Sequence, residues 1–371
     1  MENFDLAIVG GSFGGLTCAA AASARGLKTV VFDKKKSPEA STQSTGIFVK
    51  EIADKVDLPS NLTRKIHGVR LYSPNFNYID LISPGYYFIA TDTCQVLKWF
   101  AKQAEKNGSD LRYGEEISNV NKEGRTIGFP DLGVSSSYLV GADGAKSRIA
   151  EIFDLGINKE FLLGTEYEVG GIGNIDGDFL HVFLDSELAP GYIAWMVPGV
   201  NITQIGVATK YPHRPNIPKF YNKIKNYFEL KNCEILNRRG GYIPCGGPVK
   251  PIAKENVCLL GDAAGFVSPM TAGGIHPAVE IGRLLGIAIS DFLQDNGFPP
   301  EQEIKKHIPS YKIKRELRRV FDIFPPPNFL LNFLLNNTVF RKTSQLIFFH
   351  HRGLLSKKAW NEILSSKNIL D

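Results

Sequence analysis

The residues best suited to chemistry near the start of the chain are a run of glycines and an acid further along. Asp33 ends the second of two apolar runs, and the turn after the first run consists of Gly10, Gly11, Ser12, Phe13, Gly14 and Gly15. Glycines let the chain turn tightly and let a pyrophosphate approach the backbone, and the N-terminus of a following helix offers free N–H groups to phosphates. A carboxylate at the end of the second strand can accept hydrogen bonds from ribose hydroxyls. The stretch predicts a nucleotide-binding βαβ unit, for NAD as readily as for FAD.

One position departs from the strict G-x-G-x-x-G pattern, because Ser12 stands where the second glycine is expected. Serine is small, so the backbone can still come close to a phosphate. The alternative interpretation is a glycine-rich turn that binds nothing. The polar loop that follows Asp33 would cross over a bound nucleotide, and its candidate contacts are Lys34, Ser44, Thr45 and Gly46. Each of these residues can equally belong to a solvated loop.

Two more strand ends carry polar residues that suit a bound cofactor. Asp143 and Gly144 follow an apolar strand, and Ser147 lies just beyond them. Gly261 and Asp262 follow the apolar residues 257–260, and a carboxylate there can bind a sugar or ribityl hydroxyl. The alternative for both pairs is a tight turn without a ligand. Two further candidate sites are Ile117, which would lie beside the first sheet, and Gly273, Gly274 and Ile275, which begin a long apolar helix with an anion-binding N-terminus.

Length and composition indicate a globular protein of more than one domain. The chain has 371 residues, of which 43% are hydrophobic and 22% charged, enough to build two sizeable cores. Its five cysteines have no metal-ligand spacing, so we expect no metal site and free thiols in a reducing compartment. The chain enters its first strand at once, so we expect no secretory signal and a cytoplasmic location.

The order of helix-type and strand-type patterns predicts an α/β protein with a discontinuous Rossmann-like nucleotide-binding domain. Residues 1–65, 91–154 and 246–300 are assigned to this domain. Residues 66–90 and 155–245 read as short strands and are assigned to a β-rich substrate domain that is inserted in two segments. Residues 301–371 form a helical C-terminal region that is both basic and apolar.

The C-terminal region has 13 Lys and Arg residues against 6 Asp and Glu residues. Its apolar clusters are too short to span a bilayer. Apolar clusters mixed with basic residues fit an interfacial element better than a nucleic-acid site, so we expect peripheral membrane contact and no nucleic-acid partner. The alternative is a helical cap that packs on the domain.

Taken together, residues 5–33, 137–148 and 256–276 resemble, in order and spacing, the flavoprotein family that includes para-hydroxybenzoate hydroxylase and the geranylgeranyl reductases. The resemblance implies that the discontinuous domain is an FAD-binding domain of the glutathione-reductase type. It implies FAD as cofactor, with NAD(P)H or another reductant as electron donor. It places the pyrophosphate at residues 10–15 and the adenosine ribose at Asp33. It places Asp143 and Gly144 below the flavin, Asp262 at the ribityl or pyrophosphate region, and residues 273–275 near the isoalloxazine.

Within this family, the segment at residues 191–199 resembles the Tyr-x-x-Trp-x-x-Pro signature of the reductases, which implies that Tyr192, Trp195 and Pro198 bind substrate. Ile193 occupies a place where flavin-dependent halogenases carry tryptophan. We therefore expect an FAD-dependent oxidoreductase that reduces C=C bonds of an isoprenoid lipid. The alternatives are a monooxygenase that hydroxylates an aromatic or polyketide substrate and a flavin-binding protein without turnover. The chemistry would be flavin-mediated, and Cys245, His276 or a bound water could donate the proton.

Overall fold

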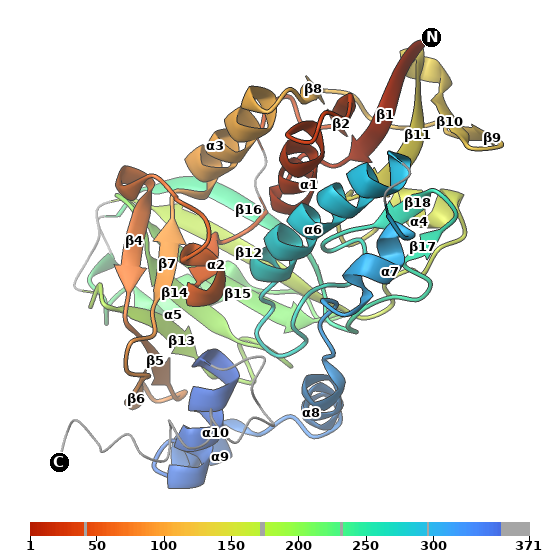
Figure 1. Cartoon of the computed structure of the whole chain (residues 1–371). Helices are drawn as coiled ribbons and strands as arrows, with labels where there is room; N and C mark the ends of the chain where they lie inside the picture. Colours follow the sequence, from red (N-terminus) through yellow and green to blue (C-terminus); the bar gives the residue numbers. More distant parts are fainter. Residues whose placement is uncertain (41–42, 171–174, 231–232, 295–296, 350–371) are drawn as a thin grey trace.

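Three β-sheets form the framework of the protein in the computed structural model, which describes residues 1–40, 43–170, 175–230, 233–294 and 297–349 (Figure 1). The N-terminal strands and the helices beside them form a nucleotide-binding half. A second, mostly antiparallel sheet lies next to it, and helices from the end of the chain lie below that sheet (Figure 1). The predicted class, a mixed α/β protein with a Rossmann-like domain, a strand-rich part and C-terminal helices, is confirmed.

The first sheet has the order β17-β18-β11-β1-β2-β8, with β10 added to β11 and β9 to β10. The strands from β18 to β8 run parallel, with Val9 of β1 opposite Phe32 of β2 and Gly141 of β11. Their carboxyl ends therefore meet at one edge, where ligands bind in such sheets. The bounds are β1 (Glu2–Val9), β2 (Thr29–Asp33), β8 (Asp110–Tyr113), β9 (Asn121–Glu123), β10 (Thr126–Phe129), β11 (Val134–Gly141), β17 (Ala253–Lys254) and β18 (Val257–Leu259).

Helix α1 lies between α3 and α6 in this half of the molecule (Figure 1). A Cβ atom at Gly282 of α6 would stand 2.6 Å from the carbonyl oxygen of Gly14, so the two helices meet backbone to backbone. Helix α3 begins after Asp92, whose carboxylate accepts a hydrogen bond from the Gln95 N–H. The helices are α1 (Phe13–Ser23), α3 (Thr93–Lys106), α4 (Arg148–Ile152), α6 (Ile275–Leu293) and α7 (Pro300–Lys305), and a 3-10 turn spans Pro130–Leu132.

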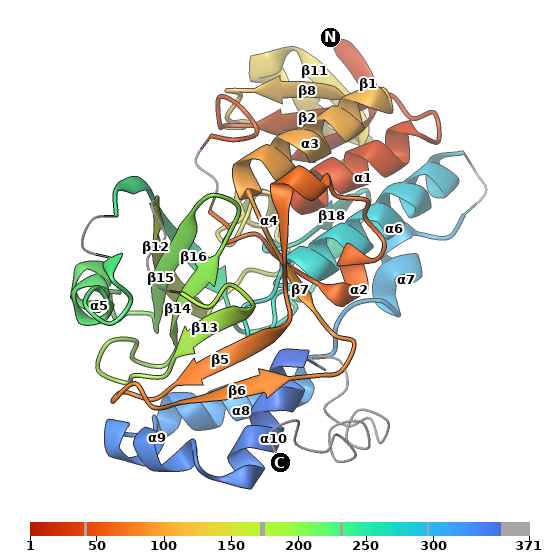
Figure 2. The ribbon, with the colours of Figure 1, turned by 90° about the vertical axis from the view of Figure 1, so that its left-hand side faces the viewer.

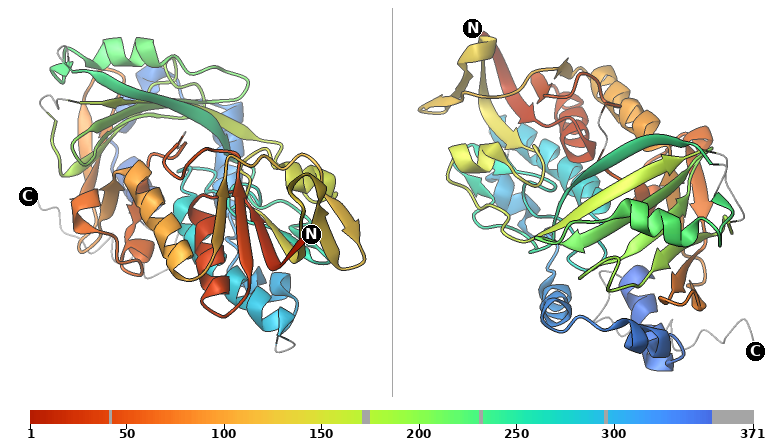
Figure 3. Two further views of the ribbon diagram at one scale, coloured as in Figure 1. Left: turned by 90° about the horizontal axis from the view of Figure 1, so that it is seen from above. Right: turned by 180° about the vertical axis from the view of Figure 1, so that it is seen from behind.

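The second sheet has the order β16-β12-β15-β14-β13-β5-β6. Strand β5, from an early part of the chain, pairs in parallel with β13, and Figure 2 shows β5 and β6 extending the sheet beyond β13. Helix α5 (Ile217–Ile224) packs on the outer face, and the opposite face looks toward the nucleotide-binding half (Figure 3). The bounds are β5 (Gly68–Tyr72), β6 (Tyr78–Ile82), β12 (Phe161–Val169), β13 (Phe179–Phe183), β14 (Ala194–Pro198), β15 (Thr203–Lys210) and β16 (Ile235–Pro244).

A third, small sheet joins segments that the sequence assigned to different domains. Its central strand β7 (Phe88–Thr91) pairs with β3 (Ile47–Val49) and with β4 (Thr63–Ile66). Helix α2 (Lys50–Ala53) follows β3, and a 3-10 turn at Ser60–Leu62 precedes β4. The predicted boundary between residues 65 and 66 thus falls within the end of β4. The domain limits themselves stay a prediction.

The C-terminal region of the described chain is helical, with α8 (Lys312–Ile323), α9 (Asn328–Leu334) and α10 (Thr338–Phe349). Helix α8 docks through Arg318, which donates to the carbonyl oxygen of Gly191 and pairs with Asp322. None of the described helices has the length and apolar character needed to cross a membrane. The predicted basic and apolar positions from residue 350 onward lie outside the described residues.

Candidate cofactor and substrate site

The turn between β1 and α1 leaves room for a ligand only because it is built from glycine. Gly10 has a φ of +114°, and a Cβ atom there would stand 2.1 Å from the carbonyl oxygen of Ala142. A Cβ atom at Gly15 would stand 2.0 Å from the carbonyl oxygen of Gly10. Ser12 occupies the N-cap of α1 without a side-chain capping bond, so it leaves the N–H groups of the first turn uncapped. This arrangement suits a pyrophosphate.

Asp33, the last residue of β2, is hydrogen-bonded to the turn between β1 and α1. Its carboxylate accepts hydrogen bonds from the backbone N–H of Gly11 at 2.7 Å and of Lys35 at 2.8 Å. Tyr113 lies beside Gly11, and its buried hydroxyl has no hydrogen-bond partner among the described residues. Burial and the nearby Asp33 charge raise the pKa of Tyr113, so its hydroxyl stays a donor. A polar atom of a bound ligand could accept a hydrogen bond from the Tyr113 hydroxyl. Lys34 is exposed and points to no described partner.

The Asp143 carboxylate lies against the N-terminus of α4, whose N-cap is Ser147. The Asp143 carboxylate accepts from the Ser147 hydroxyl at 2.6 Å and from the Ile149 N–H at 3.1 Å. Burial raises its pKa. The side chain is thus occupied within the protein, and its proposed role near a flavin would be to hold the turn, which Gly144 makes with a φ of +91°.

Asp262 is the carboxylate with open acceptor capacity in this region. Among the described residues its side chain has no hydrogen-bond partner, and burial raises its pKa to about 6. A Cβ atom at Gly274, the N-cap of α6, would stand 3.2 Å from Asp262 Oδ1. Gly273, Gly274 and Ile275 therefore place an uncapped helix N-terminus next to an acid that can accept from a sugar or ribityl hydroxyl.

Asn158 is a residue of this site that the sequence did not single out. Its Nδ2 donates to the carbonyl oxygen of Ala145 at 3.0 Å and to that of Asp262 at 2.9 Å. It thereby fastens the turn after β11 to the turn after β18. A lone asparagine after a helix carries no motif, so only the structure reveals this link.

The loop at residues 44–46 is held at several points. The Thr93 hydroxyl donates to the carbonyl oxygen of Thr45 at 3.1 Å, and the Thr91 hydroxyl donates to that of Gly46 at 2.8 Å. The Gly46 N–H donates to the Ser44 hydroxyl at 3.2 Å. Because Gly46 has a φ of +74° and touches the Thr93 side chain, no larger residue fits there. These hydrogen bonds anchor the loop to the end of β7 and the start of α3.

Two other predicted contacts have side chains in the hydrophobic core. Ile117 is buried within the main core cluster of the nucleotide-binding half. Phe13 packs edge-on against Phe48 and Phe100, with both ring centroids 5.4 Å away. Only the backbones of Ile117 and Phe13 remain available for a cofactor.

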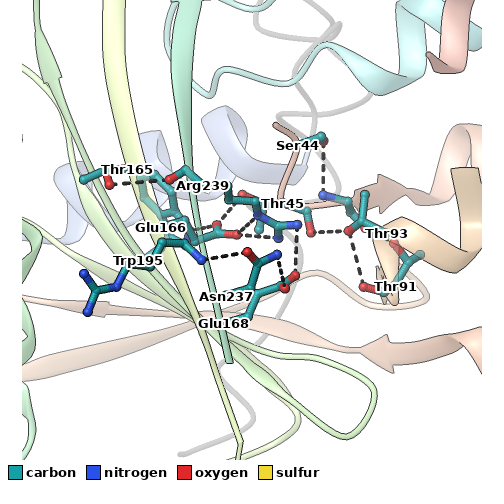
Figure 4. Close-up of polar contacts among 12 residues, drawn as sticks. Ser44, Thr45, Thr91, Thr93, Thr165, Glu166, Glu168, Trp195, Asn237 and Arg239 are labelled. Atoms are coloured by element: carbon teal, nitrogen blue, oxygen red, sulfur yellow. Dashed lines mark hydrogen bonds and ion pairs between the residues drawn. The ribbon is translucent and has the colours of Figure 1, made fainter. Parts of the chain in front are cut away.

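The three predicted substrate residues do not share one wall. Trp195 and Pro198 lie three residues apart on β14, so their side chains point to opposite faces of the sheet. Tyr192 precedes the strand, and the Arg318 guanidinium lies 5.9 Å from its ring centroid. Trp195 lies on the face opposite α5, which looks toward the nucleotide-binding half. Its indole N–H donates to Glu166 Oε2 at 2.8 Å, within a polar network that the sequence did not indicate (Figure 4).

The two candidate proton donors both have partners. His276 pairs with Glu280 one turn along α6, with Nε2 and Oε2 3.2 Å apart. The Lys210 ammonium lies 3.5 Å from Cys245 Sγ, and burial raises the pKa of that thiol. Neither arrangement singles out a donor.

The parts of this edge suit a dinucleotide cofactor. Gly10 and Gly15, which admit no side chain, lie there with the acid on β2, the Asp262 carboxylate and the N-termini of α1 and α6. The fold is that of a flavoprotein with a Rossmann-like nucleotide-binding domain. Residues 8–64 match the family model described as an NAD(P)-binding Rossmann-like domain.

Similar proteins specify this class further. The chain is 27% identical over 342 residues to digeranylgeranylglycerophospholipid reductase 3 of Methanosphaera stadtmanae, covering 85% of each chain. It superimposes with a TM-score of 0.81 on a geranylgeranyl bacteriochlorophyll reductase-like structure from Thermoplasma acidophilum, at 20% identity and 95% and 97% coverage. It also matches aklavinone-11 hydroxylase in complex with FAD and aklavinone, with a TM-score of 0.65, 16% identity and 91% and 71% coverage. The resemblance to the geranylgeranyl reductase family is thereby confirmed.

Proposed function

We propose that the protein reduces carbon–carbon double bonds of an isoprenoid lipid chain. The observation that carries this proposal is the similarity, over 85% of both chains, to a protein named digeranylgeranylglycerophospholipid reductase. Reduced FAD supplies a hydride when bound, and NAD(P)H or another reductant would reduce the flavin again. Residues 10–15 and Asp33 would hold the pyrophosphate and ribose, and Asp262 with the N-terminus of α6 would hold the part nearer the flavin ring.

The protein's own part in catalysis is to bind and orient an apolar chain. The face of the second sheet opposite α5 carries buried apolar side chains, among them Val182 and Val197, with Trp195 packed beside them. An apolar wall of this kind excludes water and holds a prenyl chain mainly by shape. We place the substrate along this wall, with Trp195 rather than Pro198 in contact with it.

We further propose that the C-terminal helices contact a membrane from which the lipid is drawn. Phe329 is 76% exposed and Phe333 70% exposed on α9, an unusual state for large apolar side chains. Exposed basic residues lie on the adjacent α8, including Lys312 and Arg319. Further exposed apolar residues are Val320 and Ile323 on α8, Phe324 directly after it and Val339 on α10. An apolar surface with basic neighbours suits the interface of an anionic bilayer.

The test separates reduction from hydroxylation, since a hydroxylase shares the fold. Purified holoenzyme is reduced and mixed, without oxygen, with a geranylgeranyl lipid. We expect reoxidation of the flavin and saturation of the lipid. Oxygen-dependent NAD(P)H consumption that an aromatic compound stimulates, with no anaerobic lipid reduction, would overturn the proposal in favour of a monooxygenase. A flavin that no acceptor reoxidises would favour a binding protein without turnover.

A further inference from the structure

A buried polar network crosses the face of the second sheet that looks toward the cofactor half (Figure 4). Its centre is Glu166 on β12, which is only 4% exposed. The Arg239 guanidinium on β16 donates from Nε to Glu166 Oε1 at 2.7 Å and also pairs with Glu168 Oε1 at 2.9 Å. Asn237 donates to the other oxygen of Glu168 at 3.0 Å. The network therefore joins two carboxylates through one guanidinium.

Strand register explains how these groups meet. Glu166 lies opposite Arg239 on one neighbouring strand and opposite Gly206 on the other. Gly206 in turn lies opposite Trp195. Because Gly206 has no side chain, the indole of Trp195 lies over it and reaches Glu166. One row of four residues across four strands thus links the guanidinium to the proposed substrate wall.

Glu166 also reaches out of the sheet to the cofactor loop. The Thr45 hydroxyl donates to Glu166 Oε2 at 2.7 Å, the same oxygen that accepts from Trp195. This is a contact between residues 121 positions apart in the chain. With Thr45, Trp195 and Arg239 all donating to it, the carboxylate acts as an acceptor for three separate elements. Such saturation argues for a positioning role rather than for proton donation.

We infer that Glu166 is a positioning residue that couples the loop carrying Thr45 to the wall carrying Trp195, so that cofactor and lipid bind cooperatively. The inference rests on the proposed function, because the wall is assigned to an isoprenoid substrate. When FAD binding orders the loop, the Thr45 hydroxyl fixes the position of Glu166 Oε2. Oε2 in turn fixes the position of the Trp195 indole. By linkage, the lipid should raise the affinity for FAD by the same factor as FAD raises the affinity for the lipid.

The variants test separately the two hydrogen bonds that Glu166 Oε2 accepts. We call the bond from Thr45 the loop arm and the bond from Trp195 the wall arm. In Glu166→Gln the amide oxygen should turn to the guanidinium, which is the stronger donor, leaving its NH2 group against the Trp195 N–H. Thr45→Val removes only the loop arm, and Trp195→Phe only the wall arm. Thr45→Ser keeps the hydroxyl. The matched control is Glu168→Gln, which removes one charge beside the same guanidinium but contacts neither Thr45 nor Trp195.

The measurement is the dissociation constant of FAD, from flavin fluorescence, with and without geranylgeraniol in detergent. In the wild-type protein we expect the lipid to tighten FAD binding by roughly fivefold or more. Glu166→Gln, Thr45→Val and Trp195→Phe should abolish this effect, whereas Thr45→Ser and Glu168→Gln should retain it. Thermal unfolding of each variant checks its folding, and the two single-arm variants suffice if Glu166→Gln fails to fold.

Three outcomes would overturn the inference: no effect of lipid in the wild type, an intact effect in the Thr45 and Trp195 variants, or an equal loss in Glu168→Gln. Failure of the proposed function is distinguishable, because it appears as a wild-type protein that binds FAD but not the lipid. Even then, Thr45→Val and Glu166→Gln should weaken FAD binding about tenfold without any lipid, while Glu168→Gln should not.

Discussion

Gly206 lies directly beneath the indole of Trp195, and a Cβ atom at Gly206 would stand 2.2 Å from the Trp195 ring. We therefore expect Gly206→Ala to displace the indole from Glu166 and to destabilise the protein by about 1–3 kcal/mol, as overpacking does. Urea unfolding measures this loss, and the KM for the lipid should rise. Gly164→Ala is the control, because its Cβ atom would come no closer than 3.4 Å to a neighbouring side chain. If Gly206→Ala and Gly164→Ala were equally stable, the position of the Trp195 indole would not require glycine at residue 206.

Asp33 should govern FAD affinity through the turn that it holds. Asp33→Asn replaces one acceptor oxygen with a donor facing the Gly11 or Lys35 N–H. We expect the dissociation constant of FAD to rise about tenfold, which corresponds to the loss of one hydrogen bond to a charged group. Fluorescence titration measures it. Asp5→Asn is matched, since Asp5 also accepts from a backbone N–H of this sheet but at its far end. If Asp5→Asn weakened FAD binding as much as Asp33→Asn does, the effect of Asp33 would not be local to the turn.

Asp262 should make the apoprotein less stable as the pH rises. Burial raises its pKa to about 6 in the folded protein, whereas the unfolded chain has the ordinary value near 4. Between these values the folded state binds more protons, so the free energy of unfolding falls as pH rises from about 4 to about 6. Asp262→Asn cannot ionise and should lack this contribution.

The measurement compares urea unfolding of the two apoproteins at pH 5 and pH 7. At pH 7 the Asp262→Asn variant should be the more stable, by up to about 3 kcal/mol. Its FAD affinity should nevertheless be lower, because the ribityl region loses a charged acceptor. A wild-type pH profile that runs parallel to that of the variant would rule out the unfavourable burial of this carboxylate.

The exposed phenylalanines of α9 should carry membrane binding. Replacing both Phe329 and Phe333 with serine should lower cosedimentation with anionic vesicles severalfold, since each side chain loses a favourable transfer from water. Activity toward a detergent-dispersed lipid should persist. The control is Phe298→Ser, because Phe298 is 68% exposed but lies outside these helices. Unchanged vesicle binding in the double variant would remove the case for this surface.

The sequence predicted the glycine turn, the helix after it and the acid that ends β2, because local chemistry determines these features. Gly10, Gly15 and Asp33 lie within one βαβ unit, where strand, turn and helix succeed each other directly. Asp92 has an equally local role, because its carboxylate caps the helix that follows it directly in the chain. Each of these roles depends on backbone conformation or on a helix end, and both leave a mark in the adjacent residues.

The substrate side was predicted less completely because strand pairing over long distances builds it. Nothing near Glu166 in the sequence announces Thr45 or Arg239, and the contact with Trp195 requires Gly206 on a third strand. The three-residue spacing of Trp195 and Pro198 looked like one signature, yet a strand turns these side chains to opposite faces. Likewise, β4 and β7 pair across the boundary at which two domains were expected to separate.

The most direct test of the central claim is the mass of a geranylgeranyl phospholipid after incubation with the reduced holoenzyme in the absence of oxygen. The account predicts that the lipid gains two hydrogens for each double bond that is saturated, while the flavin absorbance of the oxidised form returns in proportion. A lipid of unchanged mass, beside a flavin that stays reduced until oxygen is admitted, would contradict it.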